Sequence, residues 1–216
     1  MTITEPLTML TDYAIALQSS GFGILLFRLG RRRQQMAIQL WAIAFGSVAI
    51  AALLGGSCHG FALLIEFSTL LLLWKLMLFA LSLAGNFMLF AAIKSRLPRR
   101  WQAWAGGLVG VKLLAYLSWI VLNPSPEDAF VYGVVDYLSA MLLVLLLELR
   151  VALPARSRSC GSGWIIAGIL ISGVAIAVQT SGLVLFRYLS SNDLYHLVQM
   201  IALYGFYRGA KLLKDR

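Results

Sequence analysis

Charged residues are scarce in this sequence of 216 residues. Only 12% of them are Asp, Glu, Lys or Arg, whereas soluble globular domains contain about 25%. Hydrophobic residues make up 60% of the chain, and no polar stretch between them is long enough to form a separate domain. This composition excludes a soluble globular protein. We expect one transmembrane domain that covers residues 1–216.

Basic residues are absent before the first apolar segment. A secretory signal peptide carries its positive charges ahead of its apolar region, but here the first basic cluster, residues 28–33, follows that region. This order is the reverse of a signal peptide. We therefore expect the first apolar segment to be a retained helix.

Long apolar runs make up most of the chain. A membrane-spanning helix needs about 20 apolar residues. Seven segments of about this length occur, at residues 10–29, 36–58, 67–93, 101–122, 129–149, 163–181 and 190–209. The sequence therefore predicts an all-α polytopic membrane protein, a bundle of seven transmembrane helices.

The basic residues cluster at alternate ends of these segments. They follow the first, third, fifth and seventh segments and include Arg28, Arg31, Arg32, Arg33, Lys94, Arg96, Arg99, Arg100, Arg150, Arg156, Arg158, Arg208, Lys211, Lys214 and Arg216. Positive charge near span ends marks the cytoplasmic side. This distribution explains the net charge of +9 without nucleic acid as a partner. It predicts an outer N-terminus and a cytoplasmic C-terminus, and the compact loops suggest a bacterial inner membrane.

Most acidic residues lie at or near the opposite, outer ends. These are Glu5, Asp12, Glu66, Glu127, Asp128, Asp136 and Asp193, which leaves only Glu148 and Asp215 on the cytoplasmic side. We expect the polar chemistry of this protein to lie in the outer half of the bundle.

The last segment carries an unusual stripe of polar side chains. Asn192 and His196 are four residues apart and Gln199 follows three residues later, so all three share one helix face. Asp193 lies three residues before His196. Burying such groups in hydrocarbon is costly, so the stripe should face the bundle interior. The only other histidine, His59, ends the second segment and is the expected partner of His196.

Several other ionisable side chains fall within the apolar segments. Asp12 either caps the first helix or belongs to a site. Lys75 is the expected counter-ion for an outer carboxylate. Lys112, at mid-depth in the fourth segment, can snorkel from a tilted helix. Asp136 is either a functional group or the structural partner of Lys75 or Lys112.

Two histidines and several carboxylates at similar depth fit a zinc site with an open position for water. His59 and His196 are the candidate metal ligands. Counting residues from the basic ends places His59 nearer the outer surface than His196. For both histidines to bind one metal ion, a helix must tilt or the second segment must unwind at Gly55-Gly56. The alternative is that each histidine is an interface residue hydrogen-bonded to a neighbour.

These residues resemble those of the CREST superfamily of seven-span membrane hydrolases, which includes the alkaline ceramidases and the progestin/adiponectin receptors. Its members carry one histidine at the end of span two and a histidine pair at the start of span seven, which bind zinc, and an aspartate in span three. His59, His196 and the N-out plan match this pattern. Asn192 stands in place of the first histidine of the pair, Gly55 in place of a serine, and Glu66 is the nearest carboxylate to the aspartate position. The resemblance fits a working hydrolase or a metal-free, inactive member.

Two functions are therefore open. The first is a hydrolase of a lipid amide or ester, in which zinc on the two histidines activates water. Glu66 or Asp136 is then the third ligand or general base, and Asn192 orients the substrate or the oxyanion.

The second is a non-enzymatic receptor or a transporter subunit. In that case Asp136 pairs with Lys75, and the histidines titrate near neutral pH. In both cases we expect an outward-facing pocket lined by spans one, two, three, five and seven, in which Asp12, Lys75, Asn192 and Asp193 contact a lipid or another ligand.

Overall fold

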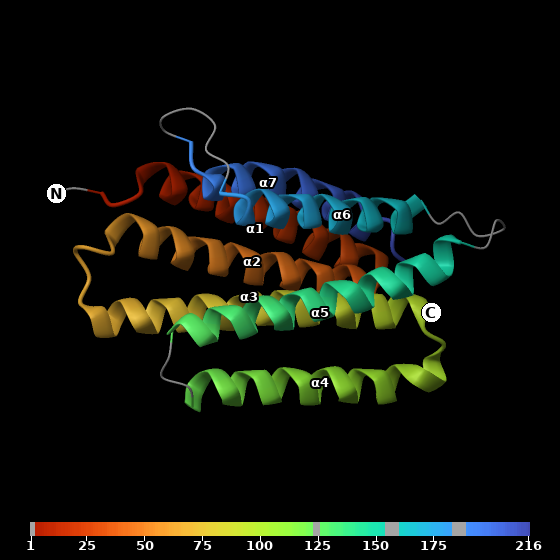
Figure 1. Ribbon diagram of the computed structural model, residues 1–216. Coiled ribbons are helices and arrows are strands. Elements are labelled where there is room, and N and C mark those ends of the chain that lie inside the picture. Colours follow the sequence, from red (N-terminus) through yellow and green to blue (C-terminus); the bar gives the residue numbers. More distant parts are fainter. Residues whose placement is uncertain (1–2, 123–125, 154–159, 183–188) are drawn as a thin grey trace.

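The computed structural model describes the whole chain except residues 1–2, 123–125, 154–159 and 183–188, and it leaves the side chains of 126–130 and 160 undescribed (Figure 1). The described residues form seven α-helices: α1 (Pro6–Arg33), α2 (Met36–Phe61), α3 (Phe67–Arg96), α4 (Arg99–Leu122), α5 (Pro126–Ala152), α6 (Cys160–Thr180) and α7 (Ser191–Ala210). The prediction of an all-α chain is confirmed, and each helix contains or closely matches one of the seven predicted segments.

Five of the helices in the described residues are long and apolar enough to cross a membrane. They are α1, α2, α3, α4 and α6, the last over Gly161–Thr180. The helices α5 and α7 have 27 and 20 residues but are not among these five. The chain therefore has the composition and the helix lengths of a membrane protein.

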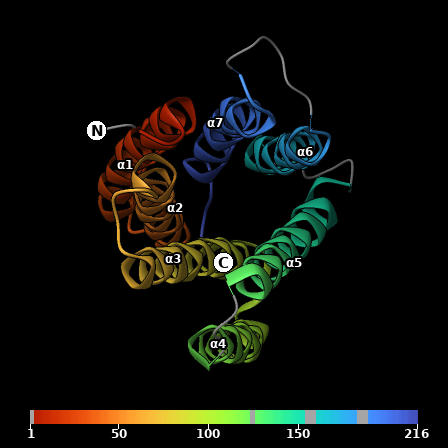
Figure 2. The ribbon, with the colours of Figure 1, turned by 60° about the vertical axis from the view of Figure 1, so that its left-hand side comes forward.

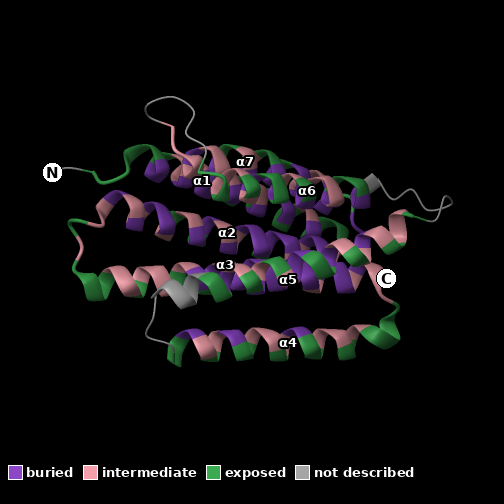
Figure 3. Cartoon of the chain, in the orientation of Figure 1, coloured by how far each residue is buried: buried purple, intermediate pink, exposed green. Residues whose placement is uncertain are grey.

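Six helices form a closed ring, and α4 lies outside it. Around the ring each helix packs on the next in the order α1, α2, α3, α5, α6, α7 and back to α1, while α4 packs on α3 (Figure 2). Only Val109, Tyr116 and Ile120 of α4 are buried, and the burial map shows α4 as the least covered helix (Figure 3). Helices that follow one another in the chain are therefore neighbours in the ring, except that α5 follows α3 there and α4 lies outside.

Small residues allow the helices to approach closely. On α7, a Cβ added at Gly205 would lie 3.4 Å from Gly168 of α6. On α2, a Cβ at Gly56 would lie 2.9 Å from the Cβ of Asp12 on α1. The Ala- and Gly-rich composition of the second segment predicts such packing, since small residues let backbones come together.

We call the end where α1, α3, α5 and α7 terminate the basic end, and the other the non-basic end. Two acids at the basic end have structural partners. Glu148 is fully buried and accepts a hydrogen bond from Arg96, with Nε to Oε1 at 3.0 Å, and Nη2 of Arg96 forms an ion pair with Oε2 at 2.8 Å. Asp215 accepts from the backbone N–H groups of Met36 and Ala37, each at 2.8 Å, and so caps the start of α2. Arg156 and Arg158 lie outside the described residues.

Candidate functional site

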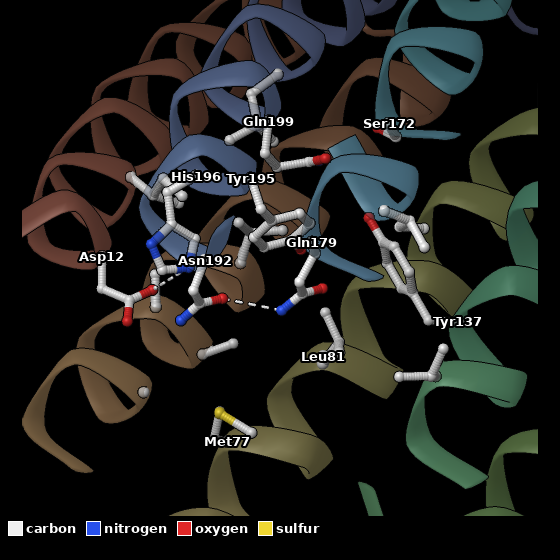
Figure 4. A pocket seen from close by; sticks show the side chains of 18 of the residues that line it. Asp12, Met77, Leu81, Tyr137, Ser172, Gln179, Asn192, Tyr195, His196 and Gln199 are labelled. Atoms are coloured by element: carbon white, nitrogen blue, oxygen red, sulfur yellow. Dashed lines mark hydrogen bonds and ion pairs between the residues drawn. The ribbon is translucent and has the colours of Figure 1, made fainter. Parts of the chain in front are cut away.

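A cavity of about 280 Å³ lies in the ring at the non-basic end. Its walls come from six helices, α1, α2, α3, α5, α6 and α7. Five of these are the predicted ones, and α6 is an addition that supplies Ser172, Ile176, Gln179 and Thr180. Polar groups gather on the side formed by α1, α6 and α7, whereas α2, apart from His59, and α3 and α5 present mainly apolar side chains such as Met77 and Leu81 (Figure 4).

The polar side centres on a contact between Asp12 of α1 and His196 of α7. The Oδ1 atom of Asp12 lies 3.3 Å from Nε2 of His196, and both residues are buried, with exposures of 6% and 5%. The Nδ1 atom of His196 lies 2.8 Å from the hydroxyl of Thr11. Both ring nitrogens are therefore held by α1. The sequence left two roles open for Asp12, a helix cap or part of a site. The structure places it beside His196 in the cavity wall.

The hydrogen-bond roles around His196 depend on the tautomer of its ring. The Thr11 hydroxyl has one proton, and three acceptors lie within its reach: the carbonyl oxygens of Leu7 at 3.1 Å and of Thr8 at 3.0 Å, and Nδ1 of His196 at 2.8 Å. A neutral ring with its proton on Nε2 accepts from Thr11 and points that proton at Oδ1 of Asp12. A ring with a proton on Nδ1 donates to Thr11 instead, and the hydroxyl then donates to a carbonyl.

Asp193 joins the start of α7 to α1. Its Oδ1 accepts from the Thr8 hydroxyl at 2.8 Å, and its Oδ2 accepts from the backbone N–H and the hydroxyl of Ser190, both at 2.8 Å. The Ser190 hydroxyl accepts in turn from the Asp193 N–H at 3.2 Å, which completes a capping box. Asp193 is therefore fully hydrogen-bonded within the protein, and it holds α7 in register with α1.

Asn192 and Gln179 connect α7 with α6 across the polar side of the cavity. The amide of Gln179 donates to Oδ1 of Asn192 at 2.9 Å, and Figure 4 shows both side chains at the cavity wall. Gln199, about two turns further along the same face of α7, also lines the cavity. The predicted polar stripe of the last segment thus faces the interior.

His59 lies in the same cavity wall but has its own partner. Its Nδ1 atom lies 2.9 Å from Oε2 of Glu5. The segment before α1 is held there by backbone bonds from Thr4 N–H to Gly60 O at 3.1 Å and from Glu5 N–H to His59 O at 3.2 Å. The two histidines therefore line one cavity, as expected, and each contacts a different carboxylate.

Sequence reasoning missed Thr8, Thr11 and Glu5 as part of this site. For the threonines a signal was present, because Thr8, Thr11 and Asp12 are spaced three and four residues apart and share one face of α1. Glu5 lies before the helix, where periodicity gives no direction. Its contact with His59 depends on how the end of α2 packs against the start of α1.

Other predicted site residues lie away from the cavity walls. Asp136 accepts from the ammonium of Lys112 on α4 and, at 2.8 Å, from the hydroxyl of Ser82 on α3. This geometry matches the structural alternative for Asp136 and gives it Lys112, not Lys75, as its partner. Lys75 is half-buried on α3 and Glu66 is exposed just before that helix, and neither lines the cavity.

The zinc site implied by the resemblance needs ligands that converge on one point. In the described part of the chain, no three His, Cys, Asp or Glu side chains form such a group. His196 has both nitrogens engaged, and Asn192 holds Gln179 where the superfamily has a histidine. The side chains as arranged do not fit a zinc ligand set. Zinc stays a prediction from the sequence.

The fold and the site together define a class: an all-α protein with helices suited to a membrane and a cavity that is polar on one side. The chain belongs to DUF6962, a family of unknown function, which it matches over residues 7–215. Comparison with curated proteins and with solved structures finds no match. The family description carries no activity, so the relationship to the CREST superfamily stays a prediction.

Proposed function

We propose that this protein is a seven-span membrane protein that binds the polar end of a membrane amphiphile in the cavity. The observation that carries the proposal is the division of the cavity into a polar side, formed around Asp12, His196, Asn192 and Gln179, and apolar walls. Small-molecule sites have this design, with few polar groups that orient a ligand among apolar surfaces.

The proposed topology has the N-terminus outside and the C-terminus in the cytoplasm. The basic residues support it, because they gather at the end of the ring opposite the cavity. The cavity then lies in the outer half of the membrane, at the depth of the head groups and the first part of the acyl chains.

The size of the cavity limits what it holds. Its volume of about 280 Å³ lies just below the usual range of about 300–1,000 Å³ for sites that enclose a drug-sized ligand. It therefore accommodates a head group and a short stretch of chain. We propose that the rest of the chain leaves between α5 and α6, which diverge towards the non-basic end (Figure 1). Leu138 of α5, 38% exposed, and the exposed Thr180 of α6 both line the cavity and support this exit.

Hydrolysis of a lipid amide or ester is the second candidate. The Glu5–His59 contact favours it, because a carboxylate that orients an imidazole commonly supports a general base, and His59 lines the cavity. His59 then replaces Glu66 and Asp136 as the candidate base, since these two residues do not reach the cavity. In this case the purified protein hydrolyses a lipid amide or ester, and His59→Ala abolishes the product.

Photo-crosslinking with a diazirine-bearing fatty alcohol in lipid nanodiscs tests the binding proposal. We expect crosslinks to concentrate on the cavity-lining segments of α3, α5 and α6 and to disappear in Ala52→Phe, which fills the cavity from α2. Gly107→Phe on α4 is the matched control, because a Cβ there meets no atom within 4 Å. Crosslinks spread evenly over all lipid-facing helices, and unchanged in Ala52→Phe, would refute the proposal.

A further inference from the structure

Carboxylates outnumber imidazoles around the cavity. Asp12, His59 and His196 are the ionisable groups among its described lining residues apart from tyrosine, and none of these lining residues is Lys or Arg. Two further carboxylates lie directly behind them, Asp193 and Glu5. With all three carboxylates ionised, the cluster carries a net charge of −3 when both imidazoles are neutral and −1 when both are protonated. The polar side of the cavity is therefore suited to a cation.

Asp12 also has an unused acceptor. Its Oδ1 atom contacts His196, but its Oδ2 atom is buried and has no hydrogen-bond partner among the described residues. A buried acceptor without a partner is costly, and natural proteins rarely leave one without a reason. A ligand that donates a hydrogen bond supplies the missing partner.

Gly55 of α2 leaves the space next to this atom open. A Cβ added there would lie 3.6 Å from Oδ2 of Asp12 and 3.3 Å from the sulfur of Met77. Gly55, Asp12 and Met77 all line the cavity. The unpartnered oxygen therefore adjoins the space in which a ligand would sit, and no side chain of α2 covers it from Gly55.

We infer that the amphiphile carries an amine, and that its ammonium group donates to Oδ2 of Asp12. A charge-assisted hydrogen bond to a buried carboxylate is about twice as strong as a neutral one. The rings of Trp74, Tyr137 and Tyr195, which also line the cavity, provide faces that attract a cation. An alcohol makes the weaker neutral bond, and a carboxylate or phosphate is repelled. This inference names the ligand class of the proposed function and rests on it.

Competition against the crosslinking probe measures this preference. Dodecylamine, dodecanol and dodecanoate have equal chains and differ only in the head group. In nanodiscs of a zwitterionic lipid we expect dodecylamine to displace the probe at about a tenfold lower mole fraction than dodecanol, and dodecanoate to displace it least. In Asp12→Asn the amine and the alcohol should become equal.

Two variants keep the test decisive. Glu66→Gln removes an exposed carboxylate at the same end of the bundle that does not line the cavity, and it should keep the preference. Gly55→Ser retains Asp12 but places a hydroxyl next to Oδ2, so the preference should fall even if Asp12→Asn does not fold. Equal competition by amine and alcohol in the wild type, or loss of the preference in Glu66→Gln alone, overturns the inference. Failure of all three amphiphiles to compete refutes the proposed function as well.

Discussion

Replacing the Lys112–Asp136 pair tests whether Asp136 holds the fold together or belongs to a ligand site. Asp136 is 7% exposed and receives bonds from Lys112 and Ser82, whereas the side chain of Lys112 is 26% exposed. In Lys112→Met the buried carboxylate keeps only the bond from Ser82. Breaking a buried pair from one side costs about 3–5 kcal/mol. We expect about 3 kcal/mol, the lower end, because the ammonium is only partly buried.

The double variant Lys112→Met/Asp136→Leu removes both charges at once. No uncompensated carboxylate remains, so its free energy of unfolding should lie within about 1 kcal/mol of wild type. The coupling energy between the two positions is then about 2 kcal/mol or more, as a double-mutant cycle defines it. Equilibrium unfolding in mixed micelles with increasing dodecyl sulfate, followed by circular dichroism, gives the four free energies.

Amphiphile binding separates structure from function in the same proteins. If the pair is structural, the double variant keeps the crosslinks of the wild type at full yield. A double variant that is as stable as wild type but no longer crosslinks would show that Asp136 contacts the ligand, and the placement of the site around Asp12 and His196 would be refuted. Single losses that simply add in the double variant would contradict the ion pair itself.

Three further predictions concern helix packing. Glu148→Gln at the basic end should cost about 3–5 kcal/mol in the same unfolding assay, since it leaves the Arg96 side chain, which is 8% exposed, without its anion, and replacing both residues by Leu and Met should restore most of that loss. Gly168→Leu should separate α6 from α7 and lower the unfolding midpoint strongly, because even its Cβ would lie 2.7 Å from a buried ring, whereas Gly107→Leu should leave the midpoint unchanged. Thr8→Val removes the bond from α1 to the buried carboxylate at the start of α7 and should cost about 1–3 kcal/mol, and an unchanged midpoint would contradict the proposed register of these helices.

Some of the candidate site was predictable from local spacing. Asn192, His196 and Gln199 fall on one face of a helix, and a polar stripe in an apolar helix must turn away from lipid. Their position on an interior cavity was therefore predictable from the sequence. The identity of the carboxylate beside His196 was not predictable. Asp12, Glu66 and Asp136 were equally plausible by depth, and depth is all that a count of residues along a helix measures.

The sequence alone determined the number, length and type of the helices and the separation of basic from acidic ends, because apolar length and charge are local properties of the chain. Only the tertiary structure decided the order of helices in the ring, the position of α4 outside it and the partners of Asp12, His59 and Asp136. A helix that is apolar on nearly every side does not indicate which side faces its neighbours. Its rotation is fixed by where small residues let backbones meet, and that rotation selects which polar groups touch.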